Sequence, residues 1–219
     1  MNKKPEVAVA TVSGKAYYMI VNELEKRNIP FLSLVPIEPV PIGIKVVLTT
    51  EAEKYLVRNE KTLTYNEMTG PEMLVSETLR VIQGKEQYER IVIGVDPGQT
   101  IGIAVLADGK IIETANCFSI EETQRKIESI LRNFAKACIN CFTVKVGNGV
   151  PTCEEKLLRL LDKALPKDVM LESVEEAGTN RDLSQTKNRR GLRDITSAIK
   201  IAGRNGLVFQ RSMTNESEN

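Results

Sequence analysis

The order of apolar runs and helical patterns between residues 89 and 204 constrains the fold more than any other feature. Three strand-like runs, at 89–96, 101–107 and 110–118, follow one another with only short turns between them. The Asp108-Gly109 pair between the last two is a strong hairpin signal. Helical patterns at 119–137, 154–165 and 188–203 then alternate with strand-like runs at 141–147 and 169–176. This order predicts an α/β domain with a mixed five-stranded sheet, whose first three strands are antiparallel and whose faces are covered by helices.

A smaller α/β domain is predicted before this one. Residues 6–12, 30–36 and 44–50 have the composition of strands, and residues 14–28 form an amphipathic helical pattern. Residues 59–88 are polar and charged, with one helix expected around residues 71–83. We therefore predict a small N-terminal α/β domain over residues 1–58, a helical connector over 59–88, the larger domain over 89–210 and a disordered tail over 211–219.

Composition restricts the chemistry more than it restricts the partners. The chain of 219 residues contains no histidine, which excludes Ser-His-Asp and Cys-His catalysis and every His-ligated metal site. Its 30 basic and 29 acidic side chains balance, so the net charge of +1 indicates no particular partner. No segment approaches the roughly 18 apolar residues of a membrane span, and the start of the chain does not resemble a secretory signal. We therefore expect a soluble cytoplasmic protein without a membrane partner.

The four cysteines of the chain are candidates for one metal site. Cys138 and Cys141 form a CxxC pair, which Cys117 and Cys153 would complete to four thiolates. Cys141 opens a strand-like run and Cys153 lies beyond its far end, so an extended chain at roughly 3.3 Å per residue separates them by about 17 Å. One zinc ion binds its thiolates at about 2.3 Å. The spacing favours ordinary buried cysteines over a single four-cysteine site.

Asp96 is the first candidate for chemistry. It ends a strand-like run that we expect in the middle of the sheet, and Gly94 and Gly98 flank it. Glycines beside an aspartate at a strand end allow backbone and ligand to approach the carboxylate closely. The alternative is that Asp96 only begins a turn. This position by itself does not distinguish the two.

Asp194 is the second candidate, because it lies on the apolar stripe of the last predicted helix. An ionised aspartate on a stripe that faces a core is costly unless it is paired or binds a metal. A structural ion pair with an arginine is the alternative. The apolar residues of the stripe are Leu192, Ile195, Ala198, Ile199, Ile201 and Ala202.

The fifth strand-like run supplies a third carboxylate, because it ends in Glu175 and Glu176. Adjacent residues of a strand point to opposite faces, so only one of the two can join Asp96 and Asp194. Three carboxylates from two strand ends and a helix are the kind of oxygen site that Mg²⁺ or Mn²⁺ prefers. Two such ions about 4 Å apart activate a water and stabilise the leaving oxygen in phosphodiester hydrolysis. A solvated strand end is the alternative for the glutamates.

Several of these segments resemble the RuvC/YqgF group of the RNase H-like superfamily. IGVDPGQTIGIAVL resembles the opening strands of that group, KVGNGVP the loop after its fourth strand, SVEEAGT its catalytic strand end and GLRDITSAIKIA its last helix. The resemblance spans about residues 89–204. This region is also similar to archaeal proteins described as candidate nucleases. The resemblance implies an RNase H-like nuclease domain. It implies Asp96, Glu176 and Asp194 as catalytic, metal-binding residues, with Glu175 as an alternative ligand.

Basic side chains are concentrated in the same region. Between residues 181 and 204 only Asp182 and Asp194 oppose the basic residues Arg181, Lys187, Arg189, Arg190, Arg193, Lys200 and Arg204. We predict that Arg181, Lys187, Arg189, Arg190 and Arg193 bind nucleic-acid phosphates beside the metal ions, although a solvated helix face is the common alternative. The aromatic content of 5% and the absence of tryptophan favour recognition of backbone or shape over base stacking.

Three functions are compatible with these patterns. The first is a metal-dependent nuclease, or resolvase-like enzyme, that acts on structured DNA or RNA. The second is a non-catalytic nucleic-acid-binding protein that keeps the fold. The third is an actin-like ATPase domain, since DPGQT also resembles the phosphate-binding turn of actin-like kinases and chaperones. The N-terminal domain is compatible with a substrate contact, a partner contact or a homodimer interface.

Overall fold

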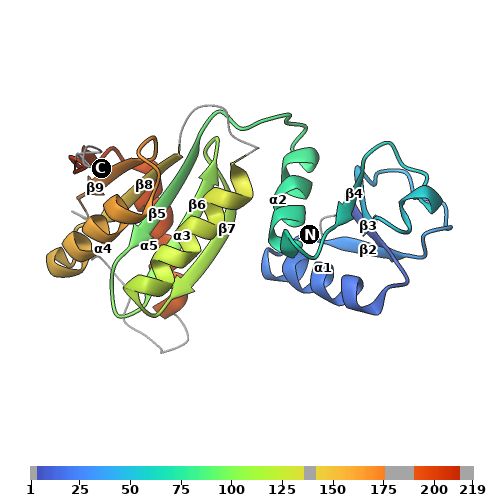
Figure 1. The fold of residues 1–219 in the computed structure, drawn as a ribbon, viewed down its shortest axis with the longest axis horizontal. Coiled ribbons are helices and arrows are strands. Elements are labelled where there is room, and N and C mark those ends of the chain that lie inside the picture. The colour runs from blue at the N-terminus through green and yellow to red at the C-terminus, as the bar shows by residue number, and fades with distance from the viewer. Residues whose placement is uncertain (1–3, 136–141, 176–189, 213–219) are drawn as a thin grey trace, which may run out of the picture. The chain divides into compact units, whose positions relative to one another are not determined.

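The computed structural model describes residues 4–135, 142–175 and 190–212. The chain divides into two compact units, Met1–Gln87 and Tyr88–Asn219, which are drawn with their elements labelled in Figure 1. Each is an α/β unit with its own sheet.

The first unit is built on a four-stranded parallel sheet in the order β2-β1-β3-β4. The strands are β1 (Val7–Ala10), β2 (Phe31–Leu34), β3 (Val46–Thr50) and β4 (Thr62–Tyr65). Helix α1 (Gly14–Lys26) joins β1 to β2, the short 3-10 helix η1 (Lys54–Leu56) lies between β3 and β4, and helix α2 (Gly70–Ile82) follows β4. Both α-helices pack on one face of the sheet. Val9 and Leu48 of the strands form one buried cluster there with Ile20, Leu24 and Leu74 of the helices.

Residues 59–88 differ from the predicted connector. β4 pairs with β3, and α2 buries Leu74 and Val75 in the core of the first unit. The helix itself was expected, but the strand before it was not. β4 has the sequence TLTY and is half-buried throughout, so its apolar signal is weak. Only pairing with β3 reveals that it belongs to the sheet.

The second unit is built on a six-stranded mixed sheet in the order β10-β9-β8-β5-β6-β7. β5 is parallel to β8 and antiparallel to β6, so the predicted antiparallel start and mixed sheet are confirmed. β10 pairs antiparallel to β9 and adds a sixth strand to the five expected. The strands are β5 (Ile91–Asp96), β6 (Ile101–Ala107), β7 (Lys110–Cys117), β8 (Phe142–Gly147), β9 (Met170–Val174) and β10 (Leu207–Val208).

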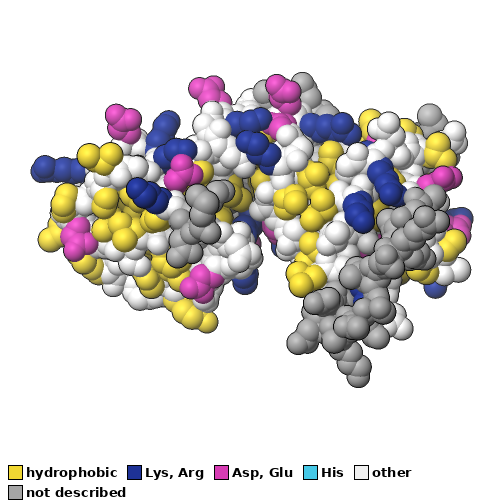
Figure 2. Space-filling view, turned by 180° about the vertical axis from the view of Figure 1, so that it is seen from behind, with side chains coloured by type: hydrophobic (Ala, Val, Ile, Leu, Met, Phe, Trp, Pro, Cys, Tyr) yellow, Lys and Arg dark blue, Asp and Glu magenta, His cyan; other side chains and the backbone are white. Residues whose placement is uncertain are grey.

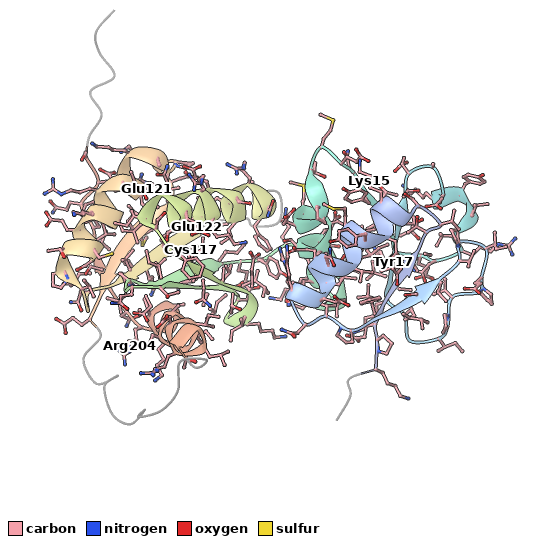
Figure 3. The ribbon with its side chains drawn as sticks, turned by 90° about the horizontal axis from the view of Figure 1, so that it is seen from below. Lys15, Tyr17, Cys117, Glu121, Glu122 and Arg204 are labelled. Carbon is pink, nitrogen blue, oxygen red and sulfur yellow. The ribbon has the colours of Figure 1, made fainter. Side chains whose placement is uncertain are left out.

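Helices cover both faces of this sheet. α3 (Ile120–Phe134) and α4 (Pro151–Ala164) contact each other and one face, whereas α5 (Arg190–Gly203) lies on the other, as Figure 3 shows. The expected cap at Ser119 is present, because its hydroxyl accepts a hydrogen bond from the Glu122 amide at 3.0 Å and the Glu122 carboxylate accepts one from Phe118 N at 2.7 Å.

Arg211 and Ser212, at the end of the described chain, are hydrogen-bonded to Asp162 of α4. Arg211, which we expected in a disordered tail, donates to the Asp162 carboxylate at 3.0 Å and to the carbonyls of Leu165 and Val169 at 2.8 and 2.9 Å. Asp162 is 4% exposed and also accepts from Ser212 N at 2.9 Å. The contact with Leu165, the C-cap residue of α4, satisfies a carbonyl that a helix C-terminus leaves without a partner. Over the residues that the structure describes, no helix is long and apolar enough to cross a membrane.

Candidate carboxylate site

Asp96 lies on the face of the second sheet that carries α5. Side chains alternate along a strand, so Val92, Gly94 and Asp96 share one face of β5. Val92 packs in a cluster with Ala198 and Ala202 of α5, which identifies that face. Asp96 is half-buried at the end of β5.

The strand register extends this position into a row across three strands. Asp96 pairs with Gly102 of β6, and Gly102 pairs with Asn116 of β7. Paired residues lie on the same face of a sheet. Asp96, Gly102 and Asn116 therefore form one row beneath α5.

Helix α5 approaches this row more closely than a side chain at Gly102 would allow. A Cβ atom at residue 102 would lie 2.3 Å from the carbonyl carbon and 2.3 Å from the carbonyl oxygen of Asp194. A Cβ atom at residue 94 would lie 2.1 Å from the carbonyl oxygen of Ala198. The two glycines thus form a notch into which the backbone of α5 fits. Asp194 is consequently held over the strand pair that contains Asp96.

The orientation of α5 brings Asp194 to the Asp96 end of the sheet. Asp194 lies over Gly102, and four residues later Ala198 lies over Gly94. Gly102 pairs with Asp96, whereas Gly94 is two residues further from that end of the β5–β6 ladder. Asp194 therefore lies at the Asp96 end of the ladder. Asp96 and Asp194 each take part in a further interaction.

Asn116 is a member of this row that the sequence did not single out. Its Oδ1 atom is buried without a hydrogen-bond partner, one of few such side-chain atoms in the described part of the chain. The first turn of α5 covers it closely, because a Cβ atom at Gly191 would lie 2.8 Å from Asn116 Nδ2. Asn116 carries no charge and lies on an edge strand, so its sequence position alone does not indicate a site. Its pairing with Gly102 places it in the row.

The ends of the parallel strands meet at the same edge of the sheet. Val95 pairs with Val146, and Gly147 with Val174, so β5, β8 and β9 end side by side. Glu175, one residue past β9, is exposed. Among the described residues no three Asp, Glu or Cys side chains lie together, so Glu175 does not join Asp96 and Asp194. Glu176 lies outside the described residues.

The predicted nucleic-acid-binding residues are mostly outside the described part of the chain. Arg181, Lys187 and Arg189 and the side chain of Arg190 are not described, whereas Arg193 is exposed on α5. Leu192, which we placed on the apolar stripe, is 66% exposed, while Ala198, Ile201 and Ala202 are buried as expected. Figure 2 shows Lys and Arg interspersed with Asp and Glu on the face in view.

A buried ion pair fixes the other end of α5. Lys145 of β8 and Glu172 of β9 are paired in register, and their Nζ and Oε2 atoms are 3.1 Å apart. Lys145 is 3% exposed and Glu172 is 8% exposed. Lys145 also donates to the carbonyl of Arg204, and Glu172 accepts from Gly206 N at 3.2 Å. The pair thus holds the chain where it leaves α5.

Cys117 and Cys153 are free cysteines, and among the described residues neither belongs to a group of three potential metal ligands. Burial raises the pKa of the Cys117 and Cys153 thiols, which disfavours the thiolate. Cys117 lies at the end of β7 beside the first turn of α3, where Glu121 and Glu122 are found (Figure 3). Cys138 and Cys141 lie outside the described residues.

The first unit has a polar cluster at the ends of β1 and β3. Glu53, 9% exposed, accepts hydrogen bonds from the hydroxyls of Thr11 at 2.5 Å and Thr50 at 2.6 Å and from Val12 N at 2.8 Å. Burial by itself would raise the pKa of Glu53, but these donors hold it below its ordinary value. In parallel sheets of this order, ligands bind where β1 and β3 diverge. Here a carboxylate held by internal donors fills that position.

Comparison with known families concerns the first unit. The family model of a response regulator receiver-like domain matches residues 6–82, about a third of the chain. That match agrees with the parallel order of the sheet and includes β4 and α2. No curated protein matches the chain.

This finding corrects the family resemblance inferred from the sequence. We assigned residues 89–204 to the RuvC/YqgF group, and that assignment is wrong: the matching family is receiver-like, not a nuclease family, and its match ends at residue 82. The resemblance was based on four short segments: the strand-turn-strand run IGVDPGQTIGIAVL, the loop KVGNGVP, the strand end SVEEAGT and the helix GLRDITSAIKIA. Such segments recur in unrelated sheets because tight turns after strands require glycine wherever they occur.

Proposed function

We propose that the second unit is a divalent-metal-dependent phosphodiester hydrolase acting on structured DNA or RNA, with an RNase H-like arrangement of its sheet. The observation that carries the proposal is that Asp194 of α5 lies over Gly102, the residue that pairs with Asp96 at the end of β5. The strand order, with an antiparallel second strand and a helix over the central strand, supports the fold assignment.

The donor set at this position fits Mg²⁺ or Mn²⁺. Asp96 and Asp194 offer carboxylate oxygens, and the buried Oδ1 of Asn116 lies in the same row without a partner. Hard divalent cations take oxygen ligands of this kind, and the histidine-free sequence offers no imidazole to compete. Such ions would lower the pKa of a bound water and neutralise charge on a phosphodiester. Glu176 remains the sequence-predicted third carboxylate.

The protein's own residues then have distinct tasks. Asp96, at the end of a central strand, is fixed by the β5–β6 ladder. Asp194 is positioned by the glycine notch and by the Lys145–Glu172 pair that holds the far end of α5. Arg193 is exposed on α5, where it would contact the phosphates of a bound strand. Both carboxylates are therefore held on rigid elements, which a preorganised site requires.

The test is a cleavage panel on the full chain with Mg²⁺ or Mn²⁺ and duplex, hairpin, junction and RNA substrates. Asp96→Asn and Asp194→Asn should each lower the cleavage rate by about a hundredfold or more, the scale of losing one charge-stabilising group. Asp168→Asn is the matched control, because Asp168 is an exposed aspartate of the same unit. No metal-dependent cleavage of any substrate by the wild type would refute the proposal.

One observation favours a second function, a nucleic-acid-binding protein without catalysis. Among the described residues, no group of three potential metal ligands of the Asp, Glu or Cys type is assembled. Salt-dependent binding of the same substrates without cleavage, unchanged by Asp96→Asn, would support this alternative.

A further inference from the structure

Asn116 carries a buried polar atom that the fold leaves unsatisfied. Its Oδ1 has no hydrogen-bond partner, although it is shielded from solvent. Leaving a buried acceptor without a partner destabilises a fold, because the lost hydrogen bond to water is not replaced. Buried polar atoms are usually satisfied, and an exception often indicates an ion or a water at that position. Within the described part of the chain no atom supplies a hydrogen bond to Asn116 Oδ1, so this oxygen is available to an ion or a water.

The surroundings of Asn116 connect it to the carboxylates. It is paired with Gly102, which is paired with Asp96, so two strand spacings of about 4.8 Å separate Asn116 from Asp96. Asp194 lies over the middle of this row, because its backbone contacts the position above Gly102. Asn116 and Asp96 thus lie on either side of Asp194.

The first turn of α5 is shaped around the amide. Gly191 faces Asn116, and any side chain at residue 191 would meet Nδ2 at 2.8 Å. Three residues later the same helix presents Asp194. The contact that buries Asn116 is therefore made by the same turn of helix that delivers the carboxylate, so the amide and Asp194 are positioned together.

We propose that Asn116 Oδ1 is an oxygen ligand for a second divalent cation, shared with Asp194, beside the cation held by Asp96 and Asp194. This assignment rests on the proposed function and adds a residue to its site. Ions about 4 Å apart, bridged by one carboxylate, fit a row that spans about 10 Å. An amide oxygen is a suitable ligand for Mg²⁺ or Mn²⁺, and it leaves the second ion less neutralised than a carboxylate would. The second ion would then attract a phosphodiester more strongly.

The experiment measures Mn²⁺ binding to the full chain by calorimetry and by electron paramagnetic resonance, independently of cleavage. The wild type should bind two ions, and Asn116→Leu should bind one, with the second site weakened at least tenfold. Asn116→Asp should retain or strengthen the second site, because it keeps an oxygen of the same reach. Thr114→Ala is the matched control: Thr114 is exposed, two residues away on the same strand face.

Stability separates a ligand from a structural residue. Because Asn116→Leu removes an unsatisfied acceptor and keeps the volume, the metal-free variant should melt at or above the wild-type temperature. If Asn116→Leu binds two ions as the wild type does, the inference is wrong while the proposed function stands. If the wild type binds Mn²⁺ at neither site and cleaves nothing, the proposed function fails and the inference fails with it. If Asn116→Leu does not fold, Asn116→Asp still decides, since weaker second-site binding in that variant would overturn the inference.

Discussion

Replacing Gly102 by alanine should separate α5 from the sheet. The added Cβ would lie 2.3 Å from the carbonyl carbon and oxygen of Asp194. Ordinary contacts of this kind begin near 3.4 Å, so α5 must move outward by about 1 Å. The obstructing atoms belong to the backbone of α5, and the added Cβ is fixed to the backbone of β6, so no side-chain rotation relieves the clash. Overpacking of a core costs about 1–3 kcal/mol, and we expect the upper part of that range.

The assay is calorimetric melting of the full chain, following the transition of the second unit. A loss of about 2–3 kcal/mol should lower its Tm by roughly 6–12 °C, scaled between the values for smaller and larger domains. Displacing Asp194 by about 1 Å should also lower metal-dependent cleavage by up to about a hundredfold.

Gly203→Ala is the control for this experiment. Gly203 is at the end of the same helix, and a Cβ there meets no atom within 4 Å. This variant should therefore melt within about 1 °C of the wild type or slightly above it. A Tm for Gly102→Ala equal to that of Gly203→Ala, with unchanged metal binding, would refute the close approach of α5 and the placement of Asp194 that depends on it.

Three further predictions concern the buried charges. Burial by itself would raise the pKa of Asp162, but hydrogen bonds from Ser212 and Arg211 hold it far below its ordinary value of 3.8. Since the pKa of Asp162 is depressed in the folded state, its stabilisation is complete above pH 3.8 and is lost as the pH falls below that value. Asp162→Asn should therefore be less stable than the wild type in urea unfolding at pH 7, and the difference in stability should narrow below pH 4. A difference that does not depend on pH would contradict this. Lys145→Met should cost about 3–5 kcal/mol because it leaves Glu172 buried without its cation, whereas the double change of Lys145 and Glu172 to Met should be nearly neutral; equal losses in the single and double variants would exclude the mechanism. Glu53→Ala should destabilise only the first unit, by about 1–3 kcal/mol, because it leaves the donors around that carboxylate without an acceptor; circular dichroism melting tests this, and a shift confined to the second unit would disagree.

Local patterns in the sequence were enough to predict most helices and strands. The run at 101–107 coincides with β6, and the apolar stripe of the last helix predicted the buried residues Ala198, Ile201 and Ala202. These predictions succeed because side-chain periodicity and turn residues act over a few positions. The predicted burial of Leu192 is wrong. Leu192 matches the apolar periodicity of the helix, but it lies near the start of the helix and is 66% exposed.

The candidate site was predicted only in its residue types. Asp96 and Asp194 were singled out because one ends a strand and the other interrupts an apolar stripe. That they lie at the same end of the same face follows from the β5–β6 register and from the notch at Gly94 and Gly102. Nothing local distinguishes a glycine that forms a turn from one that admits a helix backbone. Asn116 was missed because its importance comes from two strand pairings and one helix contact.

By itself, the sequence determined that the chain contains a mixed α/β unit after a smaller one and that any catalysis must proceed without histidine. Only the tertiary structure decided that residues 62–82 complete the first sheet and its core, that Lys145 and Glu172 form a buried pair, and that Arg211 closes the end of α4. Each of these depends on contacts between residues far apart in the chain. The periodicity of a segment predicts which face of a helix or strand a residue occupies. Strand register and helix packing decide which residues that face contacts.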